Sequence, residues 1–447
     1  RNNPEDPRKA AQPLQMRRRP YAVYNYRPAS PPPIGIYHRV FSDFRQMMDP
    51  NTPAAQPTHD KYDEAHDFCM KALRYYNYPY QREVHGSYQL QRLGLLETQH
   101  VEFDGRKMRV DGATLSATIP SGFKSVAAIT EINTELDMDG TDPATRAECG
   151  YLQIYASDAA SPIRAASCCP ALLIAHVGPN IQVLGAAFAD DVLIEPLTDY
   201  ISLIPRITAH DDTYDVVVRL FHAIRSALQT LHTHYADIAR QLASEGTPSW
   251  PLFVEPHFTQ FTHPIYGPIT LTYTRRLAVD KPSVAVFKAK ARFDAGSRDV
   301  FVKFTDTYGV EGHKLLEDNQ LAPELLYCQT DTSVCATVVV MDFVKGVRVR
   351  APLTDAQEKD LRTAVELLHE QDLVFGDLLP KNVFVLEGSS RIRLVGFDWC
   401  GKVGKAQYPC NLKLDRTMEW PAGMDGGELI DKGHDTRFLE QIIAQHV

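Results

Sequence analysis

The stretch that decides the fold is LVFGDLLPKNVFVL, residues 373–386, which is soon followed by RLVGFDWCGK, residues 393–402. In the first stretch Asp377 and Asn382 have the spacing D-x-x-x-x-N, so a carboxylate and an amide stand at the two ends of one tight loop. The loop lies between a predicted helix, DAQEKDLRTAVELLHEQ, and two short β-type runs. The pattern predicts that Asp377 accepts a proton and that Asn382 binds a metal ion.

Residues upstream of this loop complete a set that suits phosphoryl transfer, which needs a lysine on the phosphates and oxygen ligands for magnesium. Lys303 ends the predicted strand VFVKF, and Glu311 begins the next helix, where we expect it to pair with Lys303. Asp342, in VVVMDF, is a further candidate for binding the nucleotide. Lys381 stands inside the loop and is placed to screen the transferred phosphate. ATP and Mg2+ are the cofactors that this set predicts.

Together with the segments MEWPAG and KGHDTRFLEQII, these two stretches resemble the fungal-type protein-kinase-like family, which is abundant in mushrooms. Members of this family usually read H-G-D-L-x-x-x-N and then I-D-F-D-W-A-G. The resemblance covers about residues 260–447, and IYHRVF and EPLTDYISL extend it loosely into the N-terminal half. It implies a two-lobed fold that binds ATP, related to the aminoglycoside and choline kinase branch. It also implies that Asp435 braces the catalytic loop from beneath.

The chain departs from the family pattern at two positions of the site. Phe375 replaces the usual histidine, and Gly396 replaces the metal-binding aspartate, which leaves Asp398 as the nearest carboxylate for the metal. No glycine-rich phosphate loop is visible, because FDAGSR reads as a turn after the second strand of this region. Losing the principal magnesium ligand predicts a transfer rate lower by about a thousandfold or more.

The N-terminal half contains VDGATLSATIPSGFKSVAAITEINTEL, residues 110–136, which resembles the core of restriction-endonuclease-like folds. Those folds place an acid on one strand and E-x-K on the next, which here match Asp111 and Glu131, with Asn133 at the lysine position. Arg146 stands where the family has a helical glutamine. Such a domain precedes a kinase-like one in Crinkler-type effectors and some spore-killing proteins. The alternative is that Asp111 and Glu131 are ordinary acids at strand ends.

These patterns predict an α/β and α+β multidomain protein, with a restriction-endonuclease-like N-terminal domain followed by a two-lobed protein-kinase-like domain. Residues 1–35 read as a Pro/Arg-rich arm that is extended or disordered, and residues 36–244 as the helical and mixed α/β endonuclease-like domain. Residues 245–256 read as a linker, and residues 257–447 as the kinase-like domain. In the first domain a helix should begin near Asp142–Pro143, and a long helix should span residues 213–244.

The amino-acid composition limits the cellular compartment and the partners that we expect for this protein. The eight cysteines form no CxxC pair, which favours a reducing compartment, and no apolar run approaches the roughly 20 residues of a membrane span. The net charge of −9 argues against wholesale coating of nucleic acid. We therefore expect an intracellular protein, cytoplasmic or nuclear, with no membrane partner. Because the chain begins with Arg1 rather than methionine, we also expect a fragment of a longer protein.

Three functions are compatible with these residues. The first is an ATP-binding, protein-kinase-like protein that transfers phosphate to protein Ser or Thr through a degenerate metal site. The second is a pseudokinase that acts as an interaction or scaffold module. The third is a nuclease-type effector or toxin that its kinase-like domain regulates. The expected partner is a protein substrate or protein partner, and the N-terminal domain offers nucleic acid as an alternative.

Overall fold

The structure is a computed structural model that describes residues 23–25, 32–52, 58–74, 76, 79–92, 96–133, 142–206, 210–247, 254–278, 281, 283–349, 352–412 and 420–444. The chain forms two compact units. Unit 1 comprises Arg1–Phe258 with the short segments Ala278–Val284 and Thr332–Cys335. Unit 2 comprises Thr259–Leu277, Ala285–Asp331 and Ala336–Val447.

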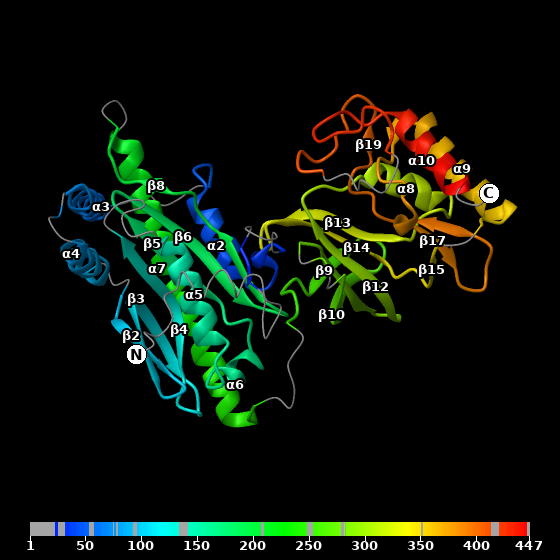
Figure 1. Ribbon diagram of the computed structural model, residues 1–447. Coiled ribbons are helices and arrows are strands. Elements are labelled where there is room, and N and C mark those ends of the chain that lie inside the picture. Colours follow the sequence, from blue (N-terminus) through cyan, green and yellow to red (C-terminus); the bar gives the residue numbers. More distant parts are fainter. Residues whose placement is uncertain are drawn as a thin grey trace, which may run out of the picture. The chain divides into compact units, whose positions relative to one another are not determined.

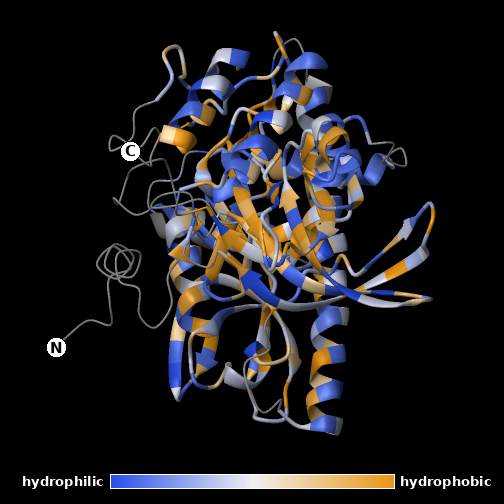
Figure 2. Ribbon diagram, turned by 90° about the vertical axis from the view of Figure 1, so that its right-hand side faces the viewer, coloured by the Kyte–Doolittle hydropathy of each residue, from blue (hydrophilic) through white to orange (hydrophobic). Residues whose placement is uncertain are grey.

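In the described residues of unit 1, eight strands form one mixed sheet with the order β1-β7-β6-β5-β4-β3-β2, and β8 pairs with β6 (Figure 1). The strands are β1 (Val23–Tyr24), β2 (Thr98–Phe103), β3 (Arg106–Thr118), β4 (Lys124–Asn133), β5 (Ala171–Val177), β6 (Asn180–Phe188), β7 (Val192–Pro196) and β8 (Ile201–Ser202). Every residue of the central strand β5 is buried, as expected for a strand covered on both faces. Figure 2 shows hydrophobic residues concentrated on the strands.

Helices pack against this sheet. They are α2 (Arg39–Met48), α3 (His59–Ala72), α4 (Pro79–Arg92), α5 (Pro143–Tyr155), α6 (Ser161–Arg164) and α7 (His210–Glu245), preceded by the short 3-10 helix η1 (Ile34–Ile36). Helix α5 packs on β4 and β5, and α7 packs on β3 (Figure 1). Asp142 caps α5, because its Oδ1 accepts a hydrogen bond from Ala144 N at 3.2 Å, and Pro143 is the first residue of the helix. Both helix predictions for this unit are therefore confirmed.

The arm predicted over residues 1–35 is described only in part, and the described part belongs to the folded unit. Val23 and Tyr24 pair in parallel with β7, so they add a strand to the sheet. Asn25 donates a hydrogen bond to Glu148 Oε2 at 2.6 Å, and all three residues of η1 are buried. The N-terminal boundary of the fold therefore lies before residue 36, because these residues bury apolar and hydrogen-bonding groups rather than remain extended in solvent.

Unit 2 begins with a six-stranded sheet in its described residues, with the order β13-β14-β12-β11-β10-β9. Its strands are β9 (Gln260–His263), β10 (Gly267–Leu277), β11 (Ala285–Phe293), β12 (Gly296–Thr305), β13 (Leu325–Asp331) and β14 (Ala336–Asp342). Helix α8 (Val310–Asp318) connects β12 to β13. Along β12, Val300, Val302 and Phe304 are buried, whereas Lys303 between them is partly exposed, so alternate residues face opposite sides.

The remainder of unit 2 combines two helices with short strands. The elements are β15 (Gly346–Arg348), α9 (Asp355–Glu370), β16 (Leu373–Val374), the 3-10 helix η2 (Pro380–Asn382), β17 (Val383–Leu386), β18 (Ile392–Leu394), β19 (Gly401–Lys402) and α10 (Lys432–Ala444). Thr354 caps α9 through a capping box with Gln357. Helices α9 and α10 pack on each other and on β16, which leads directly into the loop of Asp377 (Figure 1).

No helix in the described residues, the 36-residue α7 included, combines the length and the apolar character that crossing a membrane requires. All eight cysteines lie in described segments, and each is a free thiol. Most of these thiols are buried and serve as small apolar side chains in the cores.

Candidate functional site

The loop from Gly376 to Asn382, called the Asp377 loop below, closes on itself through side-chain contacts. Asn382 Nδ2 donates to the main-chain oxygen and to Oδ2 of Asp377, both at 2.8 Å. Lys381 Nζ lies 2.8 Å from the same Oδ2. Asp377 and Asn382 are buried, whereas the Lys381 side chain is about half exposed. The loop thus places a carboxylate, an amide and an ammonium group within contact of one another.

Asp435 fixes this loop from helix α10. Its Oδ2 accepts a hydrogen bond from Phe375 N at 2.7 Å, and its Oδ1 accepts one from Gly376 N at 2.8 Å. His369 Nε2 lies 3.3 Å from Oδ2. Asp435 is fully buried, and hydrogen bonds from main-chain N–H groups are what make a buried carboxylate tolerable. Asp435 thus holds the main chain directly before Asp377, and its role in a catalytic site stays a prediction.

A column of buried rings connects the loop to helix α8. Phe375 meets Phe397 edge to face at 5.1 Å between ring centroids, and Phe397 stacks on His313 at 4.6 Å. Burial lowers the pKa of His313 to about 4, so its ring is neutral at pH 7. The neutral ring is satisfied on both sides, because Nε2 lies 2.8 Å from Pro323 O and Nδ1 lies 2.6 Å from Tyr308 OH. Phe375 therefore contributes to the packing between the loop and α8.

Lys303 of β12 forms an ion pair with Asp398, with 2.5 Å between Nζ and Oδ2. Thr305 Oγ1 donates to the other carboxylate oxygen, Oδ1, at 3.2 Å, and Thr307 Oγ1 donates to Asp398 O at 3.0 Å. Both side chains of the pair are about four-fifths buried. The carboxylate that we expected to bind metal is therefore also the partner of the candidate phosphate-binding lysine.

Glu311 does not pair with Lys303, which corrects the expectation from sequence. The Glu311 side chain is 61% exposed and lies 3.6 Å from Lys402 Nζ. The reason is the packing of α8: a Cβ at Gly312 would lie 2.3 Å from Cys400 Sγ, so only glycine fits there. Because neighbouring residues on a helix point about 100° apart, turning Gly312 toward Cys400 turns Glu311 toward solvent.

Asp342 also lies apart from Lys303, again unlike the expectation. In the register of β12 and β14, Lys303 pairs with Val339 and Val300 pairs with Asp342, so the two side chains are about 10 Å apart along the sheet. Asp342 instead forms an ion pair with Arg298, with 3.1 Å between Oδ1 and Nε. The distance between Asp342 and Lys303 is set by the register of β12 and β14, which cannot be read from the sequence.

Gly396 lies against the amide of Asn382. Its φ of +84° is in the left-handed region that favours glycine, and a Cβ there would lie 2.7 Å from Asn382 Oδ1. Any side chain at this position must displace the amide, which makes two hydrogen bonds to Asp377. The space of the missing carboxylate is thus partly filled by Asn382.

Burial makes Asp377 an unusual carboxyl group. Its pKa is raised by desolvation, although Lys381 and the hydrogen bond from Asn382 act in the opposite direction, and the charge of Asp398 adds to the rise. Its Oδ1 is buried and has no hydrogen-bond partner in the described residues. A buried acceptor without a donor suits a ligand that carries a hydroxyl group.

Unit 1 brings together Asp111 and Glu131 on neighbouring strands, because Gly112 of β3 pairs with Thr130 of β4. Arg146 Nη2 lies between them, 2.9 Å from Asp111 Oδ2 and 3.1 Å from Glu131 Oε2. It also donates to Ile132 O at 3.0 Å, and Ile132 N donates to Asp111 Oδ2 at 2.7 Å. A guanidinium group thus stands between the two carboxylates that a nuclease would use for metal.

The electrostatics of this cluster agree with that geometry. The pKa of Glu131 is raised well above its usual range, first by burial and then by the neighbouring Asp111, while Arg146 lowers it. Asn133, at the end of β4, pairs with Val177 of β5 and adds no positive charge. Among the described residues, His, Cys, Asp and Glu form no group of three that could hold a metal ion. The residues present therefore do not fit a catalytic metal in unit 1.

The sequence does not predict two of the contacts in the candidate sites. Thr305, which donates to Asp398, lies two residues after Lys303 and so on the same face of β12, a signal that strand alternation offers. Arg146 was noted only as a substitute for glutamine, not as the partner of two acids. Arg146 lies in the first turn of α5 and is distant in sequence from Asp111, so no local pattern indicates this pair.

No family model and no curated protein matches this chain. Solved structures match in part. The Cydia pomonella granulovirus kinase PK-1 is 16% identical with a TM-score of 0.24, and the match covers 29% of this chain and 54% of that one. Vaccinia related kinase 3 is 14% identical with a TM-score of 0.30, covering 43% and 68%. The chain thus spans about half the length of the first of these proteins, and similarity at this level decides nothing about activity.

The ion pairs that Arg146 forms with Asp111 and Glu131 in unit 1 can be tested by mutation. Arg146→Ala should leave two buried carboxylates side by side and destabilise unit 1 by about 3–5 kcal/mol, as when one partner of a buried ion pair is removed. Mn2+ should restore part of that loss in the variant, because paired carboxylates bind hard divalent cations. Thermal unfolding with and without Mn2+ measures both effects.

Arg240→Ala is the matched control, since Arg240 pairs with Asp237 on the exposed surface of α7 and should cost little. Equal unfolding midpoints for the two variants, or no effect of Mn2+ on Arg146→Ala, would contradict the view that the guanidinium group takes the place of a metal ion.

Proposed function

We propose that unit 2 is a protein-kinase-like domain that binds ATP and transfers its terminal phosphate to a Ser or Thr hydroxyl of a protein, at a rate lowered by Gly396. The observation that carries the proposal is the Asp377 loop, in which base, amide and lysine are held together while Asp435 fixes the main chain before them. Phosphoryl transfer depends on such positioning more than on covalent chemistry by the protein.

Each residue has a role that its contacts support. Asp377 accepts the proton of the acceptor hydroxyl, and its partnerless Oδ1 is the atom available for that hydrogen bond. Lys381, next to Asp377 and half exposed, neutralises charge on the phosphate during transfer. Lys303 holds the other phosphates of the nucleotide and leaves Asp398 when they bind.

Mg2+ fits this site with fewer carboxylates than usual. Asn382 Oδ1 and the Asp398 carboxylate would hold the ion, and Mg2+ is commonly held by one or two carboxylates together with nucleotide phosphates. When bound, the ion neutralises charge on the phosphates. Gly396 supplies no side-chain oxygen where the family pattern has a carboxylate, so transfer should be slow.

A pseudokinase is the second candidate, and specific contacts favour it. The Lys303–Asp398 pair and the hydrogen bonds from Asn382 to Asp377 satisfy most of the polar groups without any ligand. Glu311, the expected partner of Lys303, is exposed. Such a domain would bind a protein partner, with or without nucleotide, and would not turn over ATP. The nuclease alternative receives no support from the Asp111, Glu131 and Arg146 contacts.

A transfer assay tests the proposal. With labelled ATP and Mg2+, the chain should phosphorylate itself or a generic protein acceptor slowly, and Asp377→Asn should reduce the rate by about a hundredfold or more because the base is lost. Asp318→Asn, at an exposed position of α8, is the matched control and should keep the rate of the original chain. Transfer by Asp377→Asn at an unchanged rate would contradict the assigned base, and no transfer by the original chain would favour the pseudokinase.

The pH dependence gives a second test. Because burial raises the pKa of Asp377, the acidic limb of kcat/KM should lie above the usual range of an aspartate. Lys381 lowers this pKa, so Lys381→Ala should move the limb to still higher pH and reduce the ionised, active fraction on that limb. A pH–rate profile measures the shift, and a limb at unchanged or lower pH in Lys381→Ala would refute the pairing.

A further inference from the structure

Unit 2 contains a cavity of about 610 Å3 that is separate from the Asp377 loop. Its walls come from β11 and β12, from the segment Asp342–Lys345 after β14, and from the ends of β17 and β18. Lys303, Asp377, Asn382 and Asp398 do not line it. Its volume is within the range of cavities that bind small molecules, roughly 300–1,000 Å3.

Two of the acids that line the cavity are already neutralised by partners. Asp299 pairs with Lys288, with 2.7 Å between Oδ2 and Nζ. Asp342 pairs with Arg298 at 3.1 Å, and Arg298 also reaches Glu324 at 2.7 Å. Arg298 is further held over the ring of Phe293. These pairs fix the walls, and Arg298 is shared between two carboxylates.

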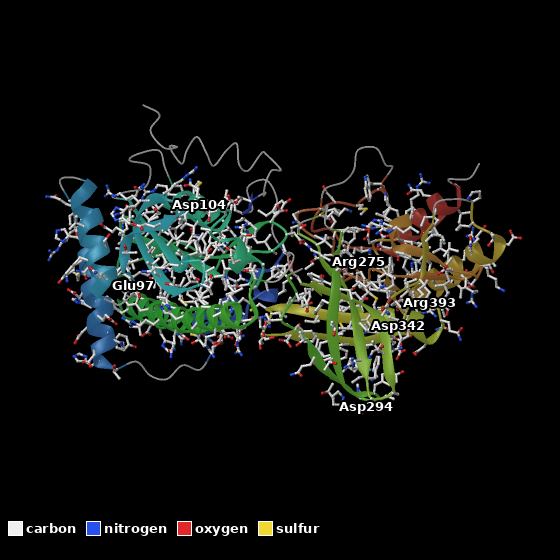
Figure 3. All side chains as sticks on the ribbon, turned by 90° about the horizontal axis from the view of Figure 1, so that it is seen from below. Glu97, Asp104, Arg275, Asp294, Asp342 and Arg393 are labelled. Carbon is white, nitrogen blue, oxygen red and sulfur yellow. The ribbon has the colours of Figure 1, made fainter. Side chains whose placement is uncertain are left out.

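Three cations in the lining have no such partner. In the described residues, no carboxylate lies within 4.0 Å of the charged groups of Lys290, Lys345 or Arg393. Arg393 Nε is buried and makes no hydrogen bond to a described residue. Figure 3 shows Arg393 near Asp342. The positive charge of Arg393 attracts the Asp342 carboxylate, although the two groups are too far apart to form an ion pair. Glu387 is the one lining carboxylate outside the pairs, and the four cations (Lys290, Arg298, Lys345 and Arg393) and three carboxylates (Asp299, Asp342 and Glu387) of the lining leave a net charge of +1.

We propose that this cavity binds a small organic ligand that carries at least two phosphate groups. Lysine and arginine are the side chains that recognise phosphate, and Lys290, Lys345 and Arg393 all line this cavity. The net charge of the free groups matches an anion, and the volume exceeds what a single phosphate would fill. The segment Asp342–Lys345 adds Phe343 to the lining, which gives the body of the ligand an apolar contact.

Binding at this place would connect two sheets of unit 2. Lys290 belongs to β11 in the six-stranded sheet, and Arg393 belongs to β18 in the three-stranded sheet. The segment between them is held at both ends, because Phe343 N donates to Asp299 O at 3.1 Å and Glu387 N donates to Lys345 O at 3.0 Å. A ligand that reaches both cations would therefore connect β11, which pairs with the strand of Lys303, to β18, which pairs with the strand that follows Asn382.

Pyrophosphate is the probe for the test, titrated calorimetrically into the full chain. We expect saturable binding that Lys290→Ala and Lys345→Ala each weaken by about tenfold or more, the equivalent of one charge-assisted hydrogen bond. Glu387→Gln should tighten binding, since it removes the opposing charge. Lys359→Ala, at an exposed position of α9, is the matched control and should leave binding unchanged.

The variant Lys303→Met separates this site from the proposed ATP site. Binding of pyrophosphate should persist in Lys303→Met, and its loss there would place the anion at Lys303 and overturn the proposal. Equal binding by the control and the cavity variants, or no binding at millimolar pyrophosphate, would also overturn it. Because no step of the titration depends on phosphate transfer, failure of the proposed kinase-like activity would leave this result intact.

Discussion

The carboxylate of Asp435, buried in helix α10 and bound to two main-chain N–H groups, is the interaction on which the candidate site depends. Those N–H groups belong to Phe375 and Gly376, directly before Asp377, so the carboxylate sets the path of the loop. The ring of Phe375 packs on Phe397, which stacks on His313 of α8, so the position of the loop is also coupled to this helix. One buried charge thus connects the loop, the Asp398 segment and the helix that follows the strand of Lys303.

Gly396 fits closely against the Asp377 loop because it has no side chain. The glycine adopts a positive φ, and the amide of Asn382 lies where a side chain would begin. Asn382 in turn donates to Asp377, so the position of Gly396 is coupled to that of Asp377. Restoring a carboxylate at this position would therefore disturb the loop, and we expect the site to work through Asp398 and Asn382 as they stand.

The sequence predicted what short-range spacing controls and missed what long-range packing controls. The closeness of Asp377 and Asn382 follows from their spacing of five residues in one loop, and the start of α5 after Asp142 follows from capping chemistry. The exposure of Glu311 depends on the contact of Gly312 with Cys400, which is distant in sequence. The separation of Asp342 from Lys303 depends on strand register, and the pairing of Arg146 with Asp111 and Glu131 joins a helix to two strands. No local pattern encodes these contacts.

The measurement that tests the account most directly is a calorimetric titration of ATP into the chain, with and without Mg2+, alongside Asp398→Asn. The account predicts that ATP binds and that Mg2+ tightens binding by about tenfold, the worth of one charge-assisted contact, in the original chain but not in Asp398→Asn. Absence of ATP binding under either condition would contradict a nucleotide site at Lys303. An equal effect of Mg2+ in the variant would contradict the role given to Asp398.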